Sequence, residues 1–250
     1  MNNSIKQAIQ QIHSFQEIKF DDLPQKTLVI FDIDETLITP ADVLLKPVGG
    51  NFKGWQKIKP EQLEHYLSIM LANTNYVLVD QAIPSLLAVL HQQKISTMGL
   101  TACSTGCVGV IPSMTQWRCD QLRQLGINFS SYFTEEYIFS ELVDVTAHPP
   151  LFKNGILFTG DLQHPEKSSK GQLLGAFLDR VAWNPEQIIF IDDHLKHLEA
   201  VQKMLDQRKI PFRGYQMDTP SPMLNEKIAA FQIQTLLDSG NWISDSQATY

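Results

Sequence analysis

Three short apolar runs constrain the fold of this 250-residue chain more than any other feature. Residues 27–31, 95–101 and 188–191 are rich in bulky and β-branched side chains, and each run ends in, or is followed by, a polar residue. Such runs are typical of strands buried on both faces of a parallel sheet. Helix-like stretches at residues 82–93 and 172–180 precede the second and third runs. This alternation predicts an α/β fold, a three-layer α/β/α sandwich around a mainly parallel, Rossmann-like sheet.

The remaining segments are arranged around this expected core. Residues 1–20 place isoleucines and a phenylalanine at helical spacing among polar residues, which predicts an amphipathic helix docked on the core, with a partner-binding helix as the alternative. Residues 39–78 interrupt the alternation with prolines and glycines before a helical pattern resumes. We expect a small, partly helical cap inserted over the sheet there. The core then comprises residues 21–38 and 79–250.

Three shorter elements complete the expected organisation. Residues 152–159 hold the dipeptide Asn154-Gly155 between apolar residues, which predicts a hairpin with a tight turn. Residues 211–215 are expected to form a last, edge strand. Residues 223–237 are expected to form a closing helix, after which Trp242 packs back on the body of the protein.

Composition excludes several classes of function. The chain has 20 lysines and arginines against 27 aspartates and glutamates, a net charge of −7, which argues against binding to nucleic acid. No window resembles the roughly 18 uncharged apolar residues of a membrane helix, and the first residues lack the apolar stretch of a signal peptide. We therefore expect no membrane partner and a cytoplasmic protein, with export by a non-classical route left open. The three cysteines, clustered between residues 103 and 119, fit reduced thiols.

The first candidate functional residues follow the first strand. Asp32 and Asp34 are two carboxylates two residues apart at the edge of the sheet where ligands of open α/β folds bind. Like charges this close need a shared proton or a cation, and Mg²⁺ is the natural candidate because it prefers hard oxygen ligands and phosphate oxygens. A calcium-binding loop also begins with this pattern, but Leu37 replaces its glycine and Val43 its final glutamate.

Other polar residues are expected at the same edge. Thr101 ends the second run, Asp192 and Asp193 follow the third, and Lys170 lies just before a helix-like stretch. A phosphoryl-binding site typically combines carboxylates that hold a metal, a hydroxyl donor and an ammonium group. Ser104 and Thr105 near the threonine, and Lys167 near the lysine, are rivals of the same type.

In this order and at these spacings, the motifs resemble those of the haloacid dehalogenase-like (HAD) superfamily, specifically its phosphatase branch with the signature D-x-D-x-T at residues 32–36. The resemblance covers residues 27–215. Residues 115–127, the expected hairpin and Lys170 also look similar to an uncharacterised bacterial branch of the superfamily.

The resemblance implies roles for the reacting residues. Asp32 would be the nucleophile that forms an aspartyl-phosphate, and Asp34 would be the general acid and then the base that activates water. Thr101 and Lys170 would bind the phosphoryl oxygens. An aspartate at position 34 favours hydrolysis or transfer of a phosphate ester, because dehalogenating relatives lack an acid there and transport ATPases usually carry threonine.

The resemblance also implies a Mg²⁺ site. Asp32, the backbone carbonyl of Asp34 and Asp192 would hold the ion, and Asp193 would be either a water-mediated ligand or a group that orients Lys170. The expected function is Mg²⁺-dependent hydrolysis of a phosphomonoester, with a small phosphorylated compound as substrate and a phosphoprotein not excluded. One alternative is a phosphotransferase or phosphomutase with a cap that excludes water. The other is a non-catalytic binding protein, whose mark would be loss of one of these aspartates.

The sequence leaves the roles of three residues near these motifs undecided or predicts only a minor role. Many relatives carry an arginine shortly after the motif threonine, which this chain lacks, so either Arg118 or a cap residue is left to supply an extra cation. His194 and His197 follow the acidic pair, and we expect both on the exposed first turn of a helix rather than as metal ligands.

Overall fold

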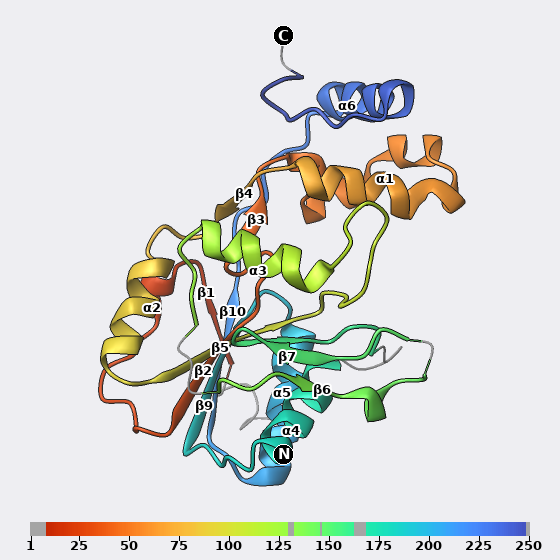
Figure 1. Ribbon diagram of the computed structural model, residues 1–250. Coiled ribbons are helices and arrows are strands. Elements are labelled where there is room, and N and C mark those ends of the chain that lie inside the picture. The colour runs from red at the N-terminus through yellow and green to blue at the C-terminus, as the bar shows by residue number, and fades with distance from the viewer. Residues whose placement is uncertain (1–8, 130–132, 146, 163–168, 249–250) are drawn as a thin grey trace.

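The computed structural model describes residues 9–129, 133–145, 147–162 and 169–248. Its main element is an eight-stranded sheet with the order β1-β10-β9-β2-β5-β8-β7-β6. Figure 1 shows this sheet between its helices. All neighbouring strands are parallel except β7, which runs antiparallel to β8 and β6. The strands are β1 (Ile9–Ile12), β2 (Thr27–Phe31), β5 (Ser96–Thr101), β6 (Tyr137–Ile138), β7 (Leu151–Lys153), β8 (Ile156–Phe158), β9 (Gln187–Asp192) and β10 (Phe212–Met217).

Helices cover both faces of this sheet, and the predicted three-layer α/β sandwich is confirmed (Figure 1). Successive side chains of a strand point to opposite faces, so β2 contributes to two separate cores. Val29 and Phe31 pack with side chains from α2 (Ile83–Gln92) and α3 (Met114–Gln124). Leu28 and Ile30 pack with side chains from α4 (Ser169–Arg180) and α5 (Leu195–Arg208). Every residue of β2, β5 and β9 is buried, as the three apolar runs predict.

The N-terminal segment differs from the predicted amphipathic helix. Residues 9–12 form the edge strand β1, parallel to β10, and the 3-10 helix η1 (Phe15–Glu17) follows. The physical reason is that β10 offers a row of backbone groups that need hydrogen-bond partners, and the short isoleucine-bounded segment supplies them. As a consequence β10 is an inner strand rather than the expected edge strand. Residues 1–8 lie outside the described part of the chain.

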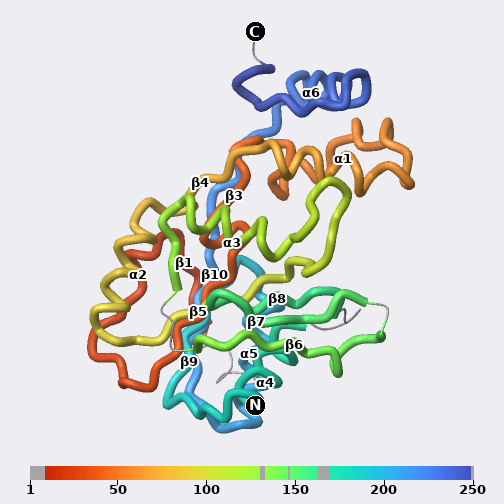
Figure 2. Tube along the Cα trace, in the orientation of Figure 1, coloured from red at the N-terminus to blue at the C-terminus, as the bar shows by residue number. Residues whose placement is uncertain are grey.

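The segment expected to be a cap leaves and re-enters the core through a small antiparallel pair, β3 (Ile38–Pro40) and β4 (Tyr76–Leu78). Between them lie three 3-10 helices and the helix α1, as the helical pattern predicts. The helices are η2 (Val43–Leu45), η3 (Pro47–Asn51), η4 (Lys53–Lys57) and α1 (Pro60–Asn73). Figure 2 traces this excursion above the sheet.

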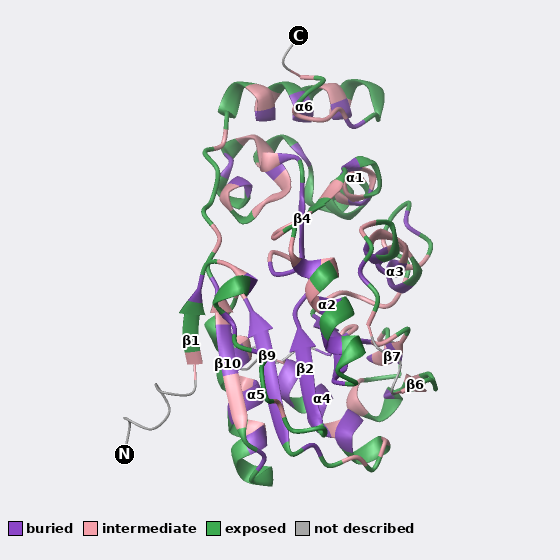
Figure 3. Cartoon of the chain, turned by 90° about the vertical axis from the view of Figure 1, so that its left-hand side faces the viewer, coloured by how far each residue is buried: buried purple, intermediate pink, exposed green. Residues whose placement is uncertain are grey.

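The C-terminal helix α6 (Glu226–Ser239) packs on this insertion and not on the sheet, as Figure 3 shows. We call residues 39–78 and 224–248 together the helical lobe. Its apolar core joins the two segments, with Leu44, Phe52, Ile58 and Met70 from the insertion and Ala229, Ile233, Leu236 and Trp242 from the C-terminal segment. The expected assignment of all residues 79–250 to the sheet core is therefore wrong at its C-terminal end, because the insertion's apolar side chains need a partner that the sheet does not provide.

The predicted hairpin is confirmed, because β7 and β8 are joined by Asn154 and Gly155. Both residues have positive φ, 50° and 78°, as a two-residue turn of this twist requires. A further 3-10 helix, η5 (Ser140–Leu142), follows β6. Among the described residues, no helix has the length and apolar character that crossing a membrane requires.

Candidate active site

The candidate residues meet at the carboxyl edge of the three central strands. Asp32 directly follows β2, and its backbone N–H still donates to the carbonyl of Ile191 on β9 at 2.8 Å. Thr101 is the last residue of β5, and Asp192 is the last residue of β9. Lys170 enters from the first turn of α4. Parallel neighbours end at the same side of a sheet, which explains why residues far apart in sequence converge here.

Lys170 is buried between two of the acids. Its ammonium group donates to Oδ1 of Asp32 and, at 2.7 Å, to Oδ2 of Asp192. Burial lowers the pKa of Lys170, but the two carboxylates outweigh burial and hold that pKa above its ordinary value. Lys170 and His197 together outweigh the effect of burial on Asp192, whose pKa lies below its ordinary value. Lys170 and Asp192 therefore form a charged pair inside the protein.

The effects of burial and of neighbouring charges on the pKa of Asp32 differ from those on Asp192. Burial raises its pKa well above the ordinary value, Lys170 opposes this increase, and the carboxylates of Asp192 and Asp34 add to it. One ammonium group is thus too little positive charge for the acids that surround it. A further cation would stabilise the ionised form of Asp32.

The acids at this edge fit a magnesium ion. Asp32, Asp192 and Asp193 each offer a carboxylate oxygen, and these oxygens lie within 4.8 Å of one another. Three carboxylates and the Lys170 ammonium leave two negative charges, which match a divalent cation. Oxygen donors alone are what Mg²⁺ prefers. The side chain of Asp34 is not in this group, so any contribution of Asp34 to an ion would come from its backbone carbonyl, as the family resemblance implies.

A tight turn fixes Asp32 relative to the acids of β9. The N–H groups of Leu37 and Ile38 both donate to the carbonyl of Ile33, at 2.9 and 3.0 Å. Thr36 then donates through its hydroxyl to Oδ2 of Asp32 at 3.2 Å. The same hydroxyl oxygen accepts the backbone N–H of Asp193 at 3.0 Å. Thr36 therefore ties the two acidic loops together.

The side chain of Asp34 turns toward a different set of groups. Its Oδ1 accepts a hydrogen bond from Arg118 on α3 at 2.5 Å, and its Oδ2 faces the Thr101 hydroxyl at 3.4 Å. The backbone N–H of Cys103 donates to the Thr101 oxygen at 3.2 Å. Arg118, one of the two sources of an extra cation that the sequence leaves open, therefore contacts the Asp34 carboxylate directly.

The threonine and lysine rivals have other surroundings. The hydroxyl of Thr105 donates to the carbonyl of Pro149 at 2.8 Å, and the hydroxyl of Ser104 accepts the N–H of Gly106 at 3.4 Å. Both stabilise the loop after β5. Lys167 lies outside the described residues.

The two histidines after the acidic pair differ from each other. His194 is half exposed, as expected, and its Nδ1 lies 2.6 Å from Asp193. His197 is not exposed as expected: only 14% of its side chain is accessible, and its Nδ1 lies 3.0 and 3.1 Å from the two oxygens of Asp192. The turn of α5 that carries His197 packs over the sheet edge, which local periodicity does not reveal. With Asp192, these histidines form a second group of nearby potential ligands.

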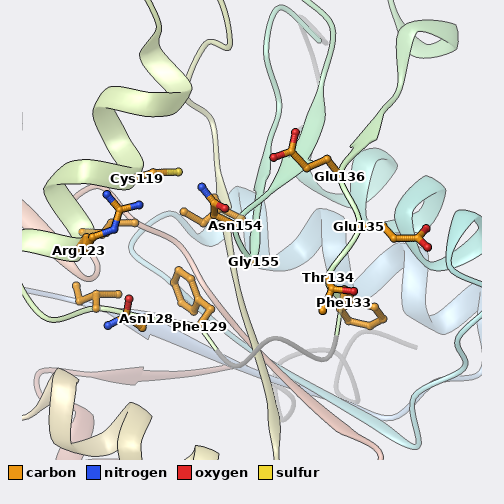
Figure 4. Close-up of a pocket in the computed structure, with 13 residues that line it drawn as sticks. Cys119, Arg123, Asn128, Phe129, Phe133, Thr134, Glu135, Glu136, Asn154 and Gly155 are labelled. Carbon is orange, nitrogen blue, oxygen red and sulfur yellow. The ribbon is translucent and has the colours of Figure 1, made fainter.

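A pocket beside the hairpin turn is separate from these residues. Figure 4 shows this pocket, of about 360 Å³, between the end of α3, the hairpin turn and residues 133–136. Its described lining includes Cys119, Arg123, Phe129 and Glu136 and none of the candidate site residues.

Fold and site together define an α/β protein with a buried lysine among acids at the carboxyl edge of a parallel sheet. The family model described as protein of unknown function (DUF2608) matches residues 2–249, and the chain belongs to this family.

Relatives of the chain occur in Rickettsia. An uncharacterised protein of Rickettsia prowazekii is 26% identical over 235 residues, which are 90% of this chain and 82% of the relative. An uncharacterised protein of Rickettsia felis is 24% identical over 252 residues, which are 91% of this chain and 82% of the relative. Among solved structures, a "putative beta-phosphoglucomutase" of Thermotoga maritima is similar with a TM-score of 0.43 and 11% identity, covering 85% of this chain and 98% of that one.

Proposed function

We propose that this protein is a Mg²⁺-dependent phosphohydrolase that cleaves a phosphomonoester through an aspartyl-phosphate on Asp32. The observation that carries the proposal is the position of Asp32: its two oxygens are held by Lys170 and Thr36 at the end of a buried strand, beside the acids of β9. In this reaction an anionic nucleophile approaches an anionic phosphoryl group. The main requirements of the site are therefore positive charge, which reduces the repulsion, and fixed positions of the reacting groups. The resemblance of the motifs to HAD phosphatases supports the same reaction.

In the first step, a carboxylate oxygen of Asp32 attacks phosphorus while the bond between phosphorus and the ester oxygen breaks. Asp34 gives a proton to the departing oxygen, which leaves as an alcohol. Lys170 neutralises charge on the phosphoryl oxygens, and Thr101 donates a hydrogen bond to them. The half-exposed side chain of Asp34, which faces the Thr101 hydroxyl, suits an acid that meets substrate from the open side of the site.

In the second step, water attacks the phosphorus of the aspartyl-phosphate and Asp34 accepts its proton. The bond between phosphorus and Asp32 breaks, which restores the carboxylate and releases inorganic phosphate. Asp32, Asp192 and Asp193 are the residues that would hold Mg²⁺ in both steps. When bound, the ion supplies positive charge that neutralises and orients phosphoryl oxygens.

The test is hydrolysis of 4-nitrophenyl phosphate by the full chain, with Mg²⁺ and with excess chelator. We expect activity only with Mg²⁺, and a loss of at least about 10³-fold in Asp32→Asn, because an amide is not a nucleophile for phosphorus. Asp179→Asn is the matched control, since Asp179 is an exposed acid paired with Arg208 far from the site.

Mass spectrometry of Asp34→Asn mixed with substrate adds a second readout. This variant should accumulate a phosphoryl group on Asp32, because water activation is slowed. An added acceptor alcohol shows whether the phosphoryl group passes to water or to another hydroxyl. Metal-independent activity, or full activity of Asp32→Asn, would contradict the proposal. Absence of activity toward both 4-nitrophenyl phosphate and a panel of natural phosphate esters would favour a binding protein.

A further inference from the structure

Arg118 is a charged side chain that is almost completely buried. It lies in the middle of α3, and only 5% of its side chain is accessible. Burial disfavours the charged form of a side chain, so a buried guanidinium group needs strong compensation. Asp34 is the main compensating group, and together with Cys103 and Tyr76 it holds the pKa of Arg118 above its ordinary value despite burial. The arginine is therefore held as a cation against the proposed acid of the reaction.

Two aromatic rings, an amide and the Cys103 side chain surround the guanidinium group. Its carbon lies 4.7 Å from the centre of the Trp117 ring and 5.2 Å from the centre of the Tyr76 ring. Its other terminal nitrogen donates to Gln121 at 2.7 Å. Guanidinium groups stack favourably on aromatic faces, and the planar fork fixes the direction of each hydrogen bond. Arg118 thus has one defined orientation.

Tyr76 connects this arrangement to the helical lobe. It is the first residue of β4, where the chain returns from the insertion, and its ring packs edge-on against Trp117 at 5.8 Å. β4 pairs with β3, which follows the loop that carries Asp32 and Asp34. The insertion therefore contacts the arginine that contacts Asp34.

The contact leaves the two oxygens of Asp34 in different situations. Arg118 donates to Oδ1 at 2.5 Å, whereas the contact of Oδ2 among the described residues is the longer one from the Thr101 hydroxyl at 3.4 Å. Oδ2 is then the oxygen that exchanges protons with the leaving group and with water. Because Arg118 is nearly inaccessible, contact with the substrate itself is disfavoured.

We propose that Arg118 is a positioning residue that fixes the carboxylate of Asp34 for proton transfer, and that Trp117 and Tyr76 hold its guanidinium group in place. The inference rests on the proposed function. In the step concerned, a proton passes from Oδ2 of Asp34 to the ester oxygen as the bond between phosphorus and that oxygen breaks. Proton transfer matters most for poor leaving groups, so a misplaced Asp34 should affect alkyl phosphates more than aryl phosphates.

The test compares kcat/KM for an alkyl phosphate, glycerol 2-phosphate, with that for 4-nitrophenyl phosphate. In Arg118→Met we expect a loss of about 10²-fold for the alkyl ester and less than about 10-fold for the aryl ester. KM should change little, because the arginine does not touch substrate. Arg118→Lys should recover part of the loss, since an ammonium group restores the charge but neither the fork nor the stacking. Arg123→Met, on an exposed arginine of the same helix, should match the wild type.

A double variant tests whether the arginine acts through Asp34. Arg118→Met combined with Asp34→Asn should be no worse than Asp34→Asn alone, because residues that act as a unit are not additive. Tyr76→Leu should show the same preference for aryl esters, with a smaller loss than Arg118→Met. Tyr76→Phe should lose less than Tyr76→Leu, because it keeps the ring and removes only the hydroxyl that hydrogen-bonds Arg118. If Arg118→Met fails to fold, Arg118→Lys and Tyr76→Leu still decide the question.

Several results would overturn the inference. A rise in KM with equal losses for both esters would show that Arg118 binds the phosphoryl group. Additive effects in the double variant would show that it acts independently of Asp34. A wild-type protein that hydrolyses neither ester would overturn the proposed function and this inference with it, whereas an active wild type with uniform losses in the variants would overturn the inference alone.

Discussion

Two buried aspartates in this molecule have opposite surroundings. Within the described part of the chain, Asp42 in the helical lobe accepts hydrogen bonds from neutral donors only: the Thr74 hydroxyl at 2.7 Å, the indole N–H of Trp242 at 2.8 Å and the backbone N–H of Asp245 at 2.8 Å. Asp192, at the sheet edge, is equally buried but lies among an ammonium group, an imidazole and two further carboxylates.

The difference separates a structural acid from a candidate functional one. The donors around Asp42 come from the insertion and from the C-terminal segment, so its carboxylate joins the two parts of the lobe without any added group. The acids around Asp192 exceed the positive charge that the chain places beside them. A carboxylate cluster of this kind costs stability unless a cation binds, which is the usual compromise between stability and activity. Four stability measurements test this distinction between structural and functional acids.

The largest effect on stability is expected from Asp42→Ala. The substitution leaves the Thr74 hydroxyl and the Trp242 indole without their acceptor inside the lobe, and we expect a loss of about 2–4 kcal/mol in the free energy of unfolding. Urea unfolding measures it. Asp42→Asn is the matched variant, because it keeps the volume and one acceptor oxygen, and it should lose less. A change below about 0.5 kcal/mol in Asp42→Ala would contradict a structural role.

The next effect concerns Mg²⁺. Binding to the folded state alone stabilises a protein by about 2.7 kcal/mol when the free ion is at 100 times its Kd. We expect thermal unfolding to shift upward with Mg²⁺ in the wild type and in Asp42→Asn, but not in Asp192→Asn. A shift that persists in Asp192→Asn would place the ion elsewhere.

A smaller effect with the opposite sign is expected from Asp32→Asn without metal. The folded state raises the pKa of Asp32, so the ionised carboxylate disfavours folding at neutral pH. Removing that charge should stabilise the metal-free protein by about 1 kcal/mol at pH 7. The gain should begin to shrink as the pH falls through the raised folded-state pKa and should vanish below the ordinary pKa of 3.8, where both states carry a protonated Asp32. Thermal unfolding with a chelator at several pH values tests this, and a destabilised variant would contradict it.

The smallest effect is expected from Asp80, which anchors the N-terminal segment. Burial alone would raise its pKa, but hydrogen bonds from the N–H of Ala82, the hydroxyl of Ser14 and the N–H of Phe15 lower it. A lowered pKa contributes stability at neutral pH that is lost as the pH falls through the folded-state value. Asp80→Asn should therefore cost less than about 1 kcal/mol at pH 7, with no difference from the wild type at strongly acidic pH. A difference that is independent of pH would contradict the charge-based explanation.

The sheet core could be predicted from the sequence because its signals are local. Strands β2, β5 and β9 are uninterrupted apolar runs, and the hairpin has its two turn residues side by side. Once parallel strands are predicted, their polar ends must meet at one edge, so the convergence of Asp32, Thr101 and Asp192 follows from topology.

Elements that depend on distant partners could not be predicted in this way. Residues 9–12 fit a helical spacing, but the edge of β10 makes them a strand. The sequence of α6 indicates an amphipathic helix, but it does not indicate which part of the protein the apolar face packs against. Likewise, nothing near Arg118 in the sequence indicates that it contacts Asp34, which is 84 residues away. A clustering of tryptophan, arginine and glutamine on one turn of a helix is the only local signal that such a buried cation leaves.

The helical lobe is built from two segments that lie far apart in the sequence, and this separation affects when the lobe can fold during synthesis. Asp42 meets Trp242 and Asp245 across separations of 200 and 203 residues, whereas the sheet is complete once β10 has been made. Contacts between such distant residues close slowly, and chains emerge from the ribosome N-terminus first. The insertion must therefore wait, with its apolar side chains uncovered, until residues 242–245 have been synthesised. During this interval the apolar side chains of the insertion are open to binding by chaperones. Because translation starts at the N-terminus, we expect the sheet core to fold before the helical lobe.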